Sequence, residues 1–129
     1  MRYLGPEWMD AARRALAADG TLRAALAGVT VTVEQVVEGG PDGTVVWHLH
    51  IDDGAVDLVP GPADAPDLRF TAAYDTAAQI ATGSLAARQA FIEGRLRLGG
   101  DLALLVTHQR ALGSVGDALA SIRPATTYH

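Results

Sequence analysis

The segment HLHIDD carries the side chains in this sequence that most resemble a catalytic set. Alternate residues of a strand point to the same face, so His48, His50 and Asp52 would share one. Imidazole and carboxylate groups are zinc ligands, which makes a metal-dependent hydrolase one hypothesis. The set is incomplete, because zinc needs three or four converging ligands and only His108 and His129 are left to supply further imidazoles. An outward strand face of polar residues is the alternative, and we expect no bound metal.

A glycine-rich corner, GRLRLGGD, raises the question of a phosphate-binding loop. Such a loop needs a lysine and a serine or threonine after its second glycine, whereas Gly99 is followed by Gly100 and Asp101. A carboxylate at the start of a helix would also repel an anion competing for the same amides. The glycines therefore indicate a turn from a strand into a helix, and no nucleotide cofactor is expected.

Other catalytic groups are scarce. Ser84 and Ser114 lie at expected helix starts, and neither is within a G-x-S-x-G nucleophile elbow. Glu93 beside Arg95 and Arg97 is the best polar cluster, and its pattern is typical of a surface ion pair. The sequence thus predicts neither an enzyme nor a cofactor.

Composition narrows the remaining classes. The chain has no cysteine, which removes disulfides and thiolate chemistry, and its net charge of -5 disfavours nucleic acid or an anionic membrane as a tight partner. No segment approaches the ~20 apolar residues of a membrane span, and the first residues do not form a signal peptide. Arginine used without any lysine, with abundant alanine and glycine, resembles high-GC bacterial coding. We expect a cytoplasmic bacterial protein.

The chain begins with a helical pattern. Apolar residues at helical spacing after Pro6 predict an amphipathic helix that ends at Asp19 and Gly20. Thr21 is expected to cap a second, short helix that closes at Gly28.

Four stretches then alternate apolar and polar residues, which predicts strands with one buried face. Gly, Pro and Asp between them predict tight turns, so the first strands should form hairpins. The strands are expected at 29–37, 44–51, 55–59 and 68–74, with turns at 38–43 and 53–54.

Helices follow the fourth strand. Asp75 or Thr76 is expected to cap one helix and Ser84 to open another, before a fifth strand in RLRLG. Asp101 should cap a last apolar helix with a hinge at the GSVG segment, 113–116. This order predicts the α+β class: a five-stranded, mainly antiparallel sheet covered on one face by helices, in a single domain over 1–129.

The apolar residues of this sheet and its helices would face one another across a single layer. Aromatic residues make up only 5% of the chain, so alanine supplies much of the apolar content and the interior is short of large side chains. An ordinary filled core and a core with a void both remain compatible with this pattern.

In its order of elements and in several local signatures, the chain resembles the sterol carrier protein 2 (SCP-2) domain family, as a stand-alone bacterial member. The matching features cover nearly the whole chain. They are the Trp8 helix, IDDGAV, PGPADAPDLRF, the Asp75-Thr76 helix start, GSLAARQAF and GRLRLGGD.

The resemblance implies a non-catalytic intracellular carrier with an apolar tunnel between sheet and helices. The ligand would be a sterol, a fatty acyl chain, an acyl-CoA or another lipid. Two alternatives stay open: a dimerisation or partner-binding module with a filled core, in a homodimer or with an enzyme partner, and the metal-dependent hydrolase of His48, His50 and Asp52. The implied ligand-binding residues are Trp47, Leu49, Phe70, Ile80, Phe91, Leu102, Leu105, Val106, Leu112, Val115 and Leu119.

Overall fold

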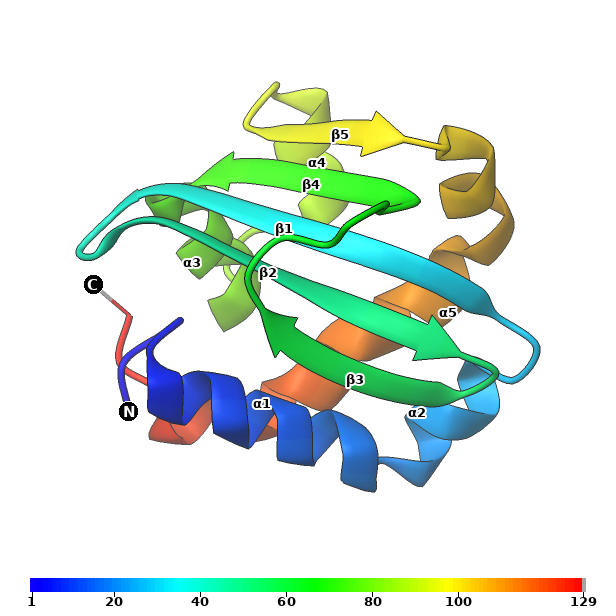
Figure 1. Ribbon diagram of the computed structural model, residues 1–129. Helices are drawn as coiled ribbons and strands as arrows, with labels where there is room; N and C mark the ends of the chain where they lie inside the picture. The colour runs from blue at the N-terminus through cyan, green and yellow to red at the C-terminus, as the bar shows by residue number, and fades with distance from the viewer. Residues whose placement is uncertain (129) are drawn as a thin grey trace.

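The computed structural model describes residues 1–128, which form a five-stranded sheet with helices packed on one face (Figure 1). The elements in chain order are α1 (Pro6–Ala18), α2 (Gly20–Ala25), β1 (Thr30–Gly40), β2 (Gly43–Asp52), β3 (Ala55–Pro60), β4 (Leu68–Ala73), α3 (Tyr74–Thr82), α4 (Ala87–Ile92), β5 (Leu96–Gly100), α5 (Leu102–Leu119) and the 3₁₀ helix η1 (Ala120–Ala125). The predicted α+β class is confirmed.

The strand order is β3-β2-β1-β4-β5. β1 pairs with β2, β2 with β3 and β4 with β5 in antiparallel fashion, whereas β1 and β4 run parallel, with Val33 opposite Leu68. The hairpin turn at Asp53 and Gly54 has the predicted form, with φ of 47° and 90° at the two positions. Strands β1, β2 and β3 form a meander with β3 at its edge. After β3 the chain crosses to the other side of β1 and forms β4, which gives the sheet its single parallel pair (Figure 1).

The connection from β3 to β4 crosses the outer face of the sheet and is held there by buried Glu34 of β1 (Figure 1). The Glu34 carboxylate accepts a hydrogen bond of 2.9 Å from the backbone nitrogen of Ala63 and one of 2.5 Å from Arg69 Nε. Nearby, the Asp67 carboxylate accepts a 2.8 Å bond from the backbone nitrogen of Thr32. These bonds fix the entry of β4 and therefore its parallel register beside β1.

The β5–α5 corner explains the glycines of GRLRLGGD. Gly100 has φ of +95°, and a side chain there would clash with the backbone carbonyl of Asp67. Asp101 caps α5 as predicted, because its carboxylate accepts bonds from the backbone nitrogens of Ala103 and Leu104 at 3.1 and 3.4 Å. The backbone conformation of this corner, and not a phosphate, therefore accounts for the glycine at position 100.

Three predicted helix caps are wrong. Asp19, not Thr21, caps α2 by accepting a 2.9 Å bond from the backbone nitrogen of Leu22. The third helix starts at Tyr74, which places both Asp75 and Thr76 inside it. Ser84 lies before α4, where its hydroxyl donates to the Gln79 carbonyl. Neither α3 nor α4 has a side-chain cap, so the adjoining strand and loop set where these helices begin.

α5 has no break at the predicted hinge, 113–116, and hinge motion there stays a prediction. Gly113 and Gly116 lie inside α5, and the one residue with non-helical angles in that helix is His108, with φ of -112° and ψ of 16°. Glycine permits a break but does not require one, and the nearby Val115 and Ala118 of α5 are buried.

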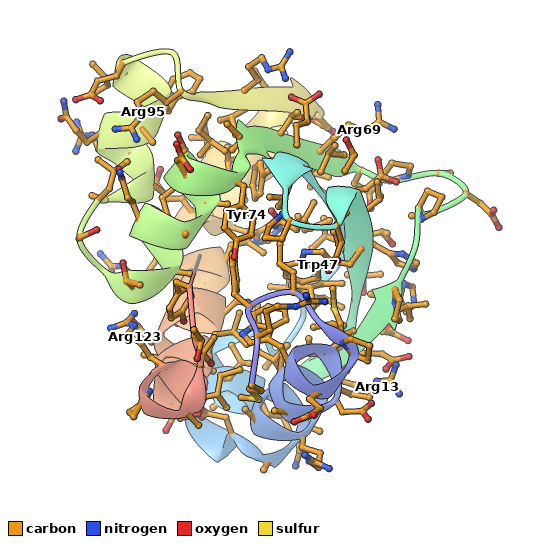
Figure 2. The ribbon with its side chains drawn as sticks, turned by 90° about the vertical axis from the view of Figure 1, so that its left-hand side faces the viewer. Arg13, Trp47, Arg69, Tyr74, Arg95 and Arg123 are labelled. Carbon is orange, nitrogen blue, oxygen red and sulfur yellow. The ribbon has the colours of Figure 1, made fainter. Side chains whose placement is uncertain are left out.

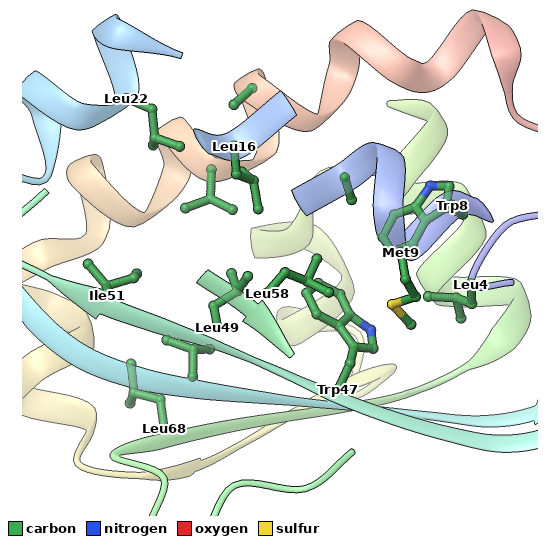
Figure 3. Close-up of a cluster of buried hydrophobic side chains, with 14 of the residues drawn as sticks. Leu4, Trp8, Met9, Leu16, Leu22, Trp47, Leu49, Ile51, Leu58 and Leu68 are labelled. Atoms are coloured by element: carbon green, nitrogen blue, oxygen red, sulfur yellow. The ribbon is translucent and has the colours of Figure 1, made fainter. Parts of the chain in front are cut away.

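The two halves of the helical layer are packed differently. α1 and α2 lay large side chains against β2 and β3, among them Trp8, Met9, Leu16 and Leu22, and all of these are buried (Figure 3). By contrast, α3, α4 and α5 contribute few fully buried side chains, and those of α4 and α5 are small: Ala90, Val115 and Ala118. The dense core therefore lies under α1 and α2.

The first prediction concerns Glu34. Burial on its own would raise the pKa of its carboxyl, but the hydrogen bonds from Arg69 and Ala63 outweigh burial and lower the pKa below its ordinary value of 4.5. A lowered folded-state pKa stabilises the fold above pH 4.5, and this stabilisation is lost as the pH falls through the folded-state pKa.

The Glu34→Gln variant should therefore lose about 1–3 kcal/mol of unfolding free energy at pH 7. The difference from wild type should shrink as the pH falls below 4.5, as measured by urea denaturation at a series of pH values. A difference that stays constant over this range would show that the charge of Glu34 does not hold the loop.

Candidate ligand-binding cavity

A cavity of about 1000 Å³ lies between the inner face of the sheet and the helices α3, α4 and α5. Its volume is at the upper end of the range of small-molecule sites, about 300–1000 Å³. The sheet wall includes Trp47, Leu49, Phe70, Leu96 and Leu98, and the helical wall includes Ile80, Phe91, Leu105, Leu112, Val115 and Leu119. Alternation in the strands and helical spacing in α5 bring these apolar side chains to one space.

Aromatic side chains are concentrated around this cavity. Six of the seven aromatic residues of the chain line it, namely Tyr3, Trp8, Trp47, Phe70, Phe91 and Tyr128. Trp8 packs edge-on against both Tyr3, at 5.2 Å between ring centroids, and Trp47, at 5.7 Å. Figure 2 shows Trp47 and Tyr74 pointing into the interior. Burial raises the pKa of the Tyr3 phenol, so this phenol is uncharged at neutral pH.

The cavity opens to solvent between α4 and α5. Phe91 of α4 and Val106 of α5 both line it, yet 50% and 69% of their surfaces are exposed. Apolar side chains of this size are normally buried, so their exposure marks the rim of the opening. Ile92 and Leu102, on the same two helices, are exposed as well.

Polar groups in the wall are few, and none is acidic among the described residues. Gln35 occupies an inward position of β1, between Val33 and Val37. It is paired with Trp47 of β2 on one side and with Phe70 of β4 on the other. Its side chain makes no hydrogen bond with any residue in 1–128. The inner sheet face thus carries one unpaired amide amid apolar residues.

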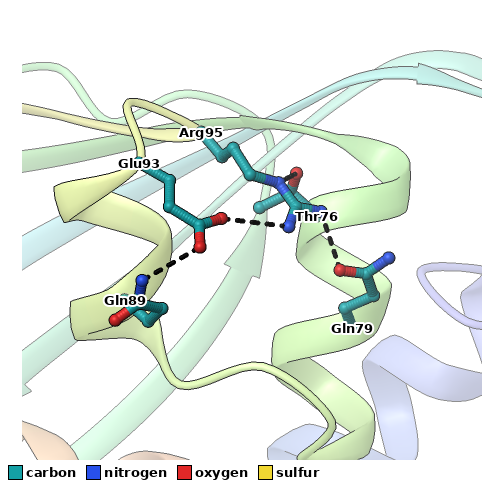
Figure 4. Close-up of polar contacts among 5 residues, drawn as sticks. All are labelled: Thr76, Gln79, Gln89, Glu93 and Arg95. Carbon is teal, nitrogen blue, oxygen red and sulfur yellow. Dashed lines mark hydrogen bonds and ion pairs between the residues drawn. The ribbon is translucent and has the colours of Figure 1, made fainter.

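Arg123 and Arg95 hold the helical wall in place. Arg123 Nε donates a 2.8 Å bond to the carbonyl of Ala81 at the end of α3, which ties η1 to that helix. Arg95, immediately before β5, donates to Thr76 and Gln79 of α3, at 3.2 and 2.7 Å (Figure 4).

Glu93 completes the Arg95 cluster. Its carboxylate accepts a 2.9 Å bond from Gln89 and a 3.5 Å bond from Arg95 (Figure 4). The Gln89 bond, followed by the bond and charge of Arg95, lowers the pKa of Glu93. The cluster joins α3 to the end of α4, as the surface ion pair expected from sequence.

Ten of the eleven predicted site residues line the cavity, and Leu102 does not. Leu102 is the first residue of α5 and 47% of its surface is exposed, so the prediction that it faces the cavity is wrong. That the other ten bind a ligand stays a prediction. Sequence reasoning missed Tyr3, Gln35, Arg88 and Arg110. Gln35 was detectable, since it is a polar residue in phase with the inward valines of its strand.

The HLHIDD strand face is engaged in other contacts. His48 Nδ1 lies 2.8 Å from the carbonyl oxygen of Gly61, and His50 Nδ1 lies 3.2 Å from the Thr32 hydroxyl. Within 1–128 no group of three or more His, Cys, Asp or Glu side chains converges as a metal site would require, and His129 lies outside the described residues. The residues in 1–128 therefore supply no set of metal ligands for the proposed hydrolase. His48 instead contacts the loop that follows β3.

The sequence model of the SCP-2 sterol transfer family matches residues 11–113, which is most of the chain. The chain belongs to this family. The match runs from α1 into α5, and it includes most of the cavity wall. No curated protein is similar enough in sequence to count as a match.

Solved structures show the SCP-2 fold in this family member. A crystal structure of sterol carrier protein 2 superposes with a TM-score of 0.77 at 22% identity, covering 92% of this chain and 98% of the other. A conserved hypothetical protein from Thermus thermophilus, described as "possibly sterol carrier protein", gives 0.76 at 22% identity over 95% and 90%. Palmitated SCP2L2 from Aedes aegypti gives 0.58 at 18% identity over 88% and 93%. Within the described residues, no helix is long and apolar enough to cross a membrane.

The second prediction concerns Gln35. Gln35→Leu replaces an unpaired amide in an apolar wall, so the unfolding free energy of the ligand-free protein should rise by about 1 kcal/mol in urea denaturation. Gln79→Leu is the matched control, because it removes the exposed amide that accepts from Arg95 and should not stabilise the protein. A loss of stability in Gln35→Leu would mean that the amide is already satisfied.

Proposed function

We propose that this SCP-2 family protein is a non-catalytic lipid carrier that holds an apolar ligand, such as a fatty acyl chain or a sterol, in the cavity. The observation that carries this proposal is the cavity of about 1000 Å³ with an apolar wall and an opening between α4 and α5. The carrier would act as a single domain over 1–129.

The energetics favour such a ligand. Each methylene group moved from water into the cavity contributes ~0.8 kcal/mol, so an acyl tail of about a dozen methylenes contributes roughly 10 kcal/mol before the costs of ordering. The wall can supply this without any reactive group. The palmitated relative supports an acyl occupant in this fold.

The wall chemistry supports binding over catalysis. Among the described residues, those that line the cavity include no His, Ser, Thr, Asp or Glu. Nucleophilic and acid–base catalysis in enzymes rely mainly on such side chains. The open volume also favours a carrier over a dimerisation module with a filled core.

The direct test is extraction of the purified protein with organic solvent and mass spectrometry of the extract. A lipid recovered in stoichiometric amount supports the carrier. If no lipid is recovered and added fatty acids or sterols do not bind, the proposal is contradicted.

The third prediction is that filling the cavity blocks binding. Ala77 of α3 lines the cavity, so Ala77→Trp should exclude about two methylene groups, at ~0.8 kcal/mol each, and weaken laurate binding by about tenfold in calorimetry. Ala17→Trp on the exposed face of α1 is the matched control and should bind like wild type.

The unfolding free energy decides whether the Ala77→Trp variant is informative. It should stay close to the wild-type value, because the new ring enters empty space instead of a packed core. Unweakened laurate binding by a folded Ala77→Trp variant would place the ligand elsewhere.

A further inference from the structure

Two arginines stand at the opening of the cavity. Arg88 of α4 precedes the rim residue Phe91 by three positions, and Arg110 of α5 follows the rim residue Val106 by four. Residues three apart share a face of a helix, which places Arg88 beside Phe91, and Arg110 follows Val106 across the irregular turn at His108. All four residues line the cavity. Both arginines are exposed, so their guanidinium groups lie where the apolar wall meets water.

Neither arginine has a partner of its own. Arg88 and Arg110 make no side-chain hydrogen bond or ion pair with any residue in 1–128, whereas Arg123 in the same wall bonds to the Ala81 carbonyl. The acidic residues that flank these helices are already engaged. Glu93 accepts from Gln89 and Arg95, and Asp101 caps α5.

The charge of the cavity wall is opposite to that of the chain. The chain has 15 acidic and 10 basic residues, yet the described wall contains three arginines and no carboxylate. A chain with a net charge of -5 repels an anion as a whole, so attraction of an anion to the opening must come from these local cations. Arginine also presents its N–H groups in a fork that matches a carboxylate or a phosphate.

From this placement we infer that the cavity selects amphiphiles with an anionic head, carboxylate or phosphate, over neutral lipids of the same length. Arg88 and Arg110 bind the head at the opening, and the tail lies along Phe70, Trp47 and Leu105 inside. The inference rests on the proposed function and specifies its ligand class. The third arginine of the wall, Arg123, already donates to the Ala81 carbonyl, and the Trp47 and Tyr3 side chains carry no charge to attract the head.

The test compares laurate with dodecan-1-ol, which has the same chain length and a neutral head, both as monomers in solution. Binding is read from the fluorescence of Trp8 and Trp47, the two tryptophans of the chain, which both line the cavity. Wild type should bind laurate about tenfold more tightly than dodecan-1-ol. An exposed ion pair shifts an equilibrium by up to about fivefold, so Arg88→Gln and Arg110→Gln should each lower the tenfold preference by about threefold.

The double variant should bind the two ligands equally, with dodecan-1-ol affinity unchanged from wild type. Arg14→Gln is the matched control, since Arg14 is exposed on α1, has no partner in the described residues and lies outside the wall; it should keep the full preference. Dodecyl phosphate in place of laurate separates the two anionic heads and should show the same loss.

Three results would overturn the inference. The first is equal binding of laurate and dodecan-1-ol by wild type, which leaves the carrier function intact. The second is a double variant that keeps its preference for laurate but no longer sediments with vesicles containing phosphatidylglycerol, which would assign the arginines to a lipid surface. The third is binding of neither ligand, which contradicts the proposed function as well.

Discussion

A shortage of side-chain volume in one half of the helical layer determines the rest of this structure. Protein interiors are normally packed to the density of organic crystals, and the α1–α2 half meets that standard with Trp8, Leu16, Leu22 and their neighbours. The α3–α5 half faces an equally apolar sheet with residues such as Ala77 and Ala81. The space that they leave is lined by hydrocarbon, and a hydrocarbon ligand is the occupant that such a wall stabilises best.

The hollow half needs support from outside the cavity, since a layer with little core of its own would otherwise collapse onto the sheet. Polar bonds at its edges supply this support. Arg95 joins the start of β5 to α3, and Arg123 joins η1 to the end of α3. On the opposite face of the sheet, Glu34 fixes the loop before β4 and so the strand that carries Phe70. These charged side chains thus support the helical layer from its edges. Most of the cavity wall is apolar, and Arg88 and Arg110 are its two unpaired arginines among the described residues.

Sequence periodicity is sufficient to predict the helices, the strands and most of the residues in the cavity wall, because alternation and helical spacing directly report which side chains share a face. It failed where tertiary contacts decide. Thr21 and Ser84 are good capping residues, but Asp19 caps α2 and the sheet positions α3 and α4. Gly113 and Gly116 lie in regular helix, whereas the irregular turn of α5 is at His108, which has no sequence signal. Arg88 and Arg110 are indistinguishable from surface charges until α4 and α5 are placed beside the opening.

The most direct test of the central claim is the position of a bound acyl chain, measured by intermolecular nuclear Overhauser effects from the terminal methyl group of laurate. We expect contacts with the rings of Phe70 and Trp47 in the hollow half, and none with Leu22 or Leu58 in the filled half. Contacts confined to the exposed side chains of Ile92 and Leu102, or no contacts with Phe70 and Trp47 at saturating laurate, would contradict it.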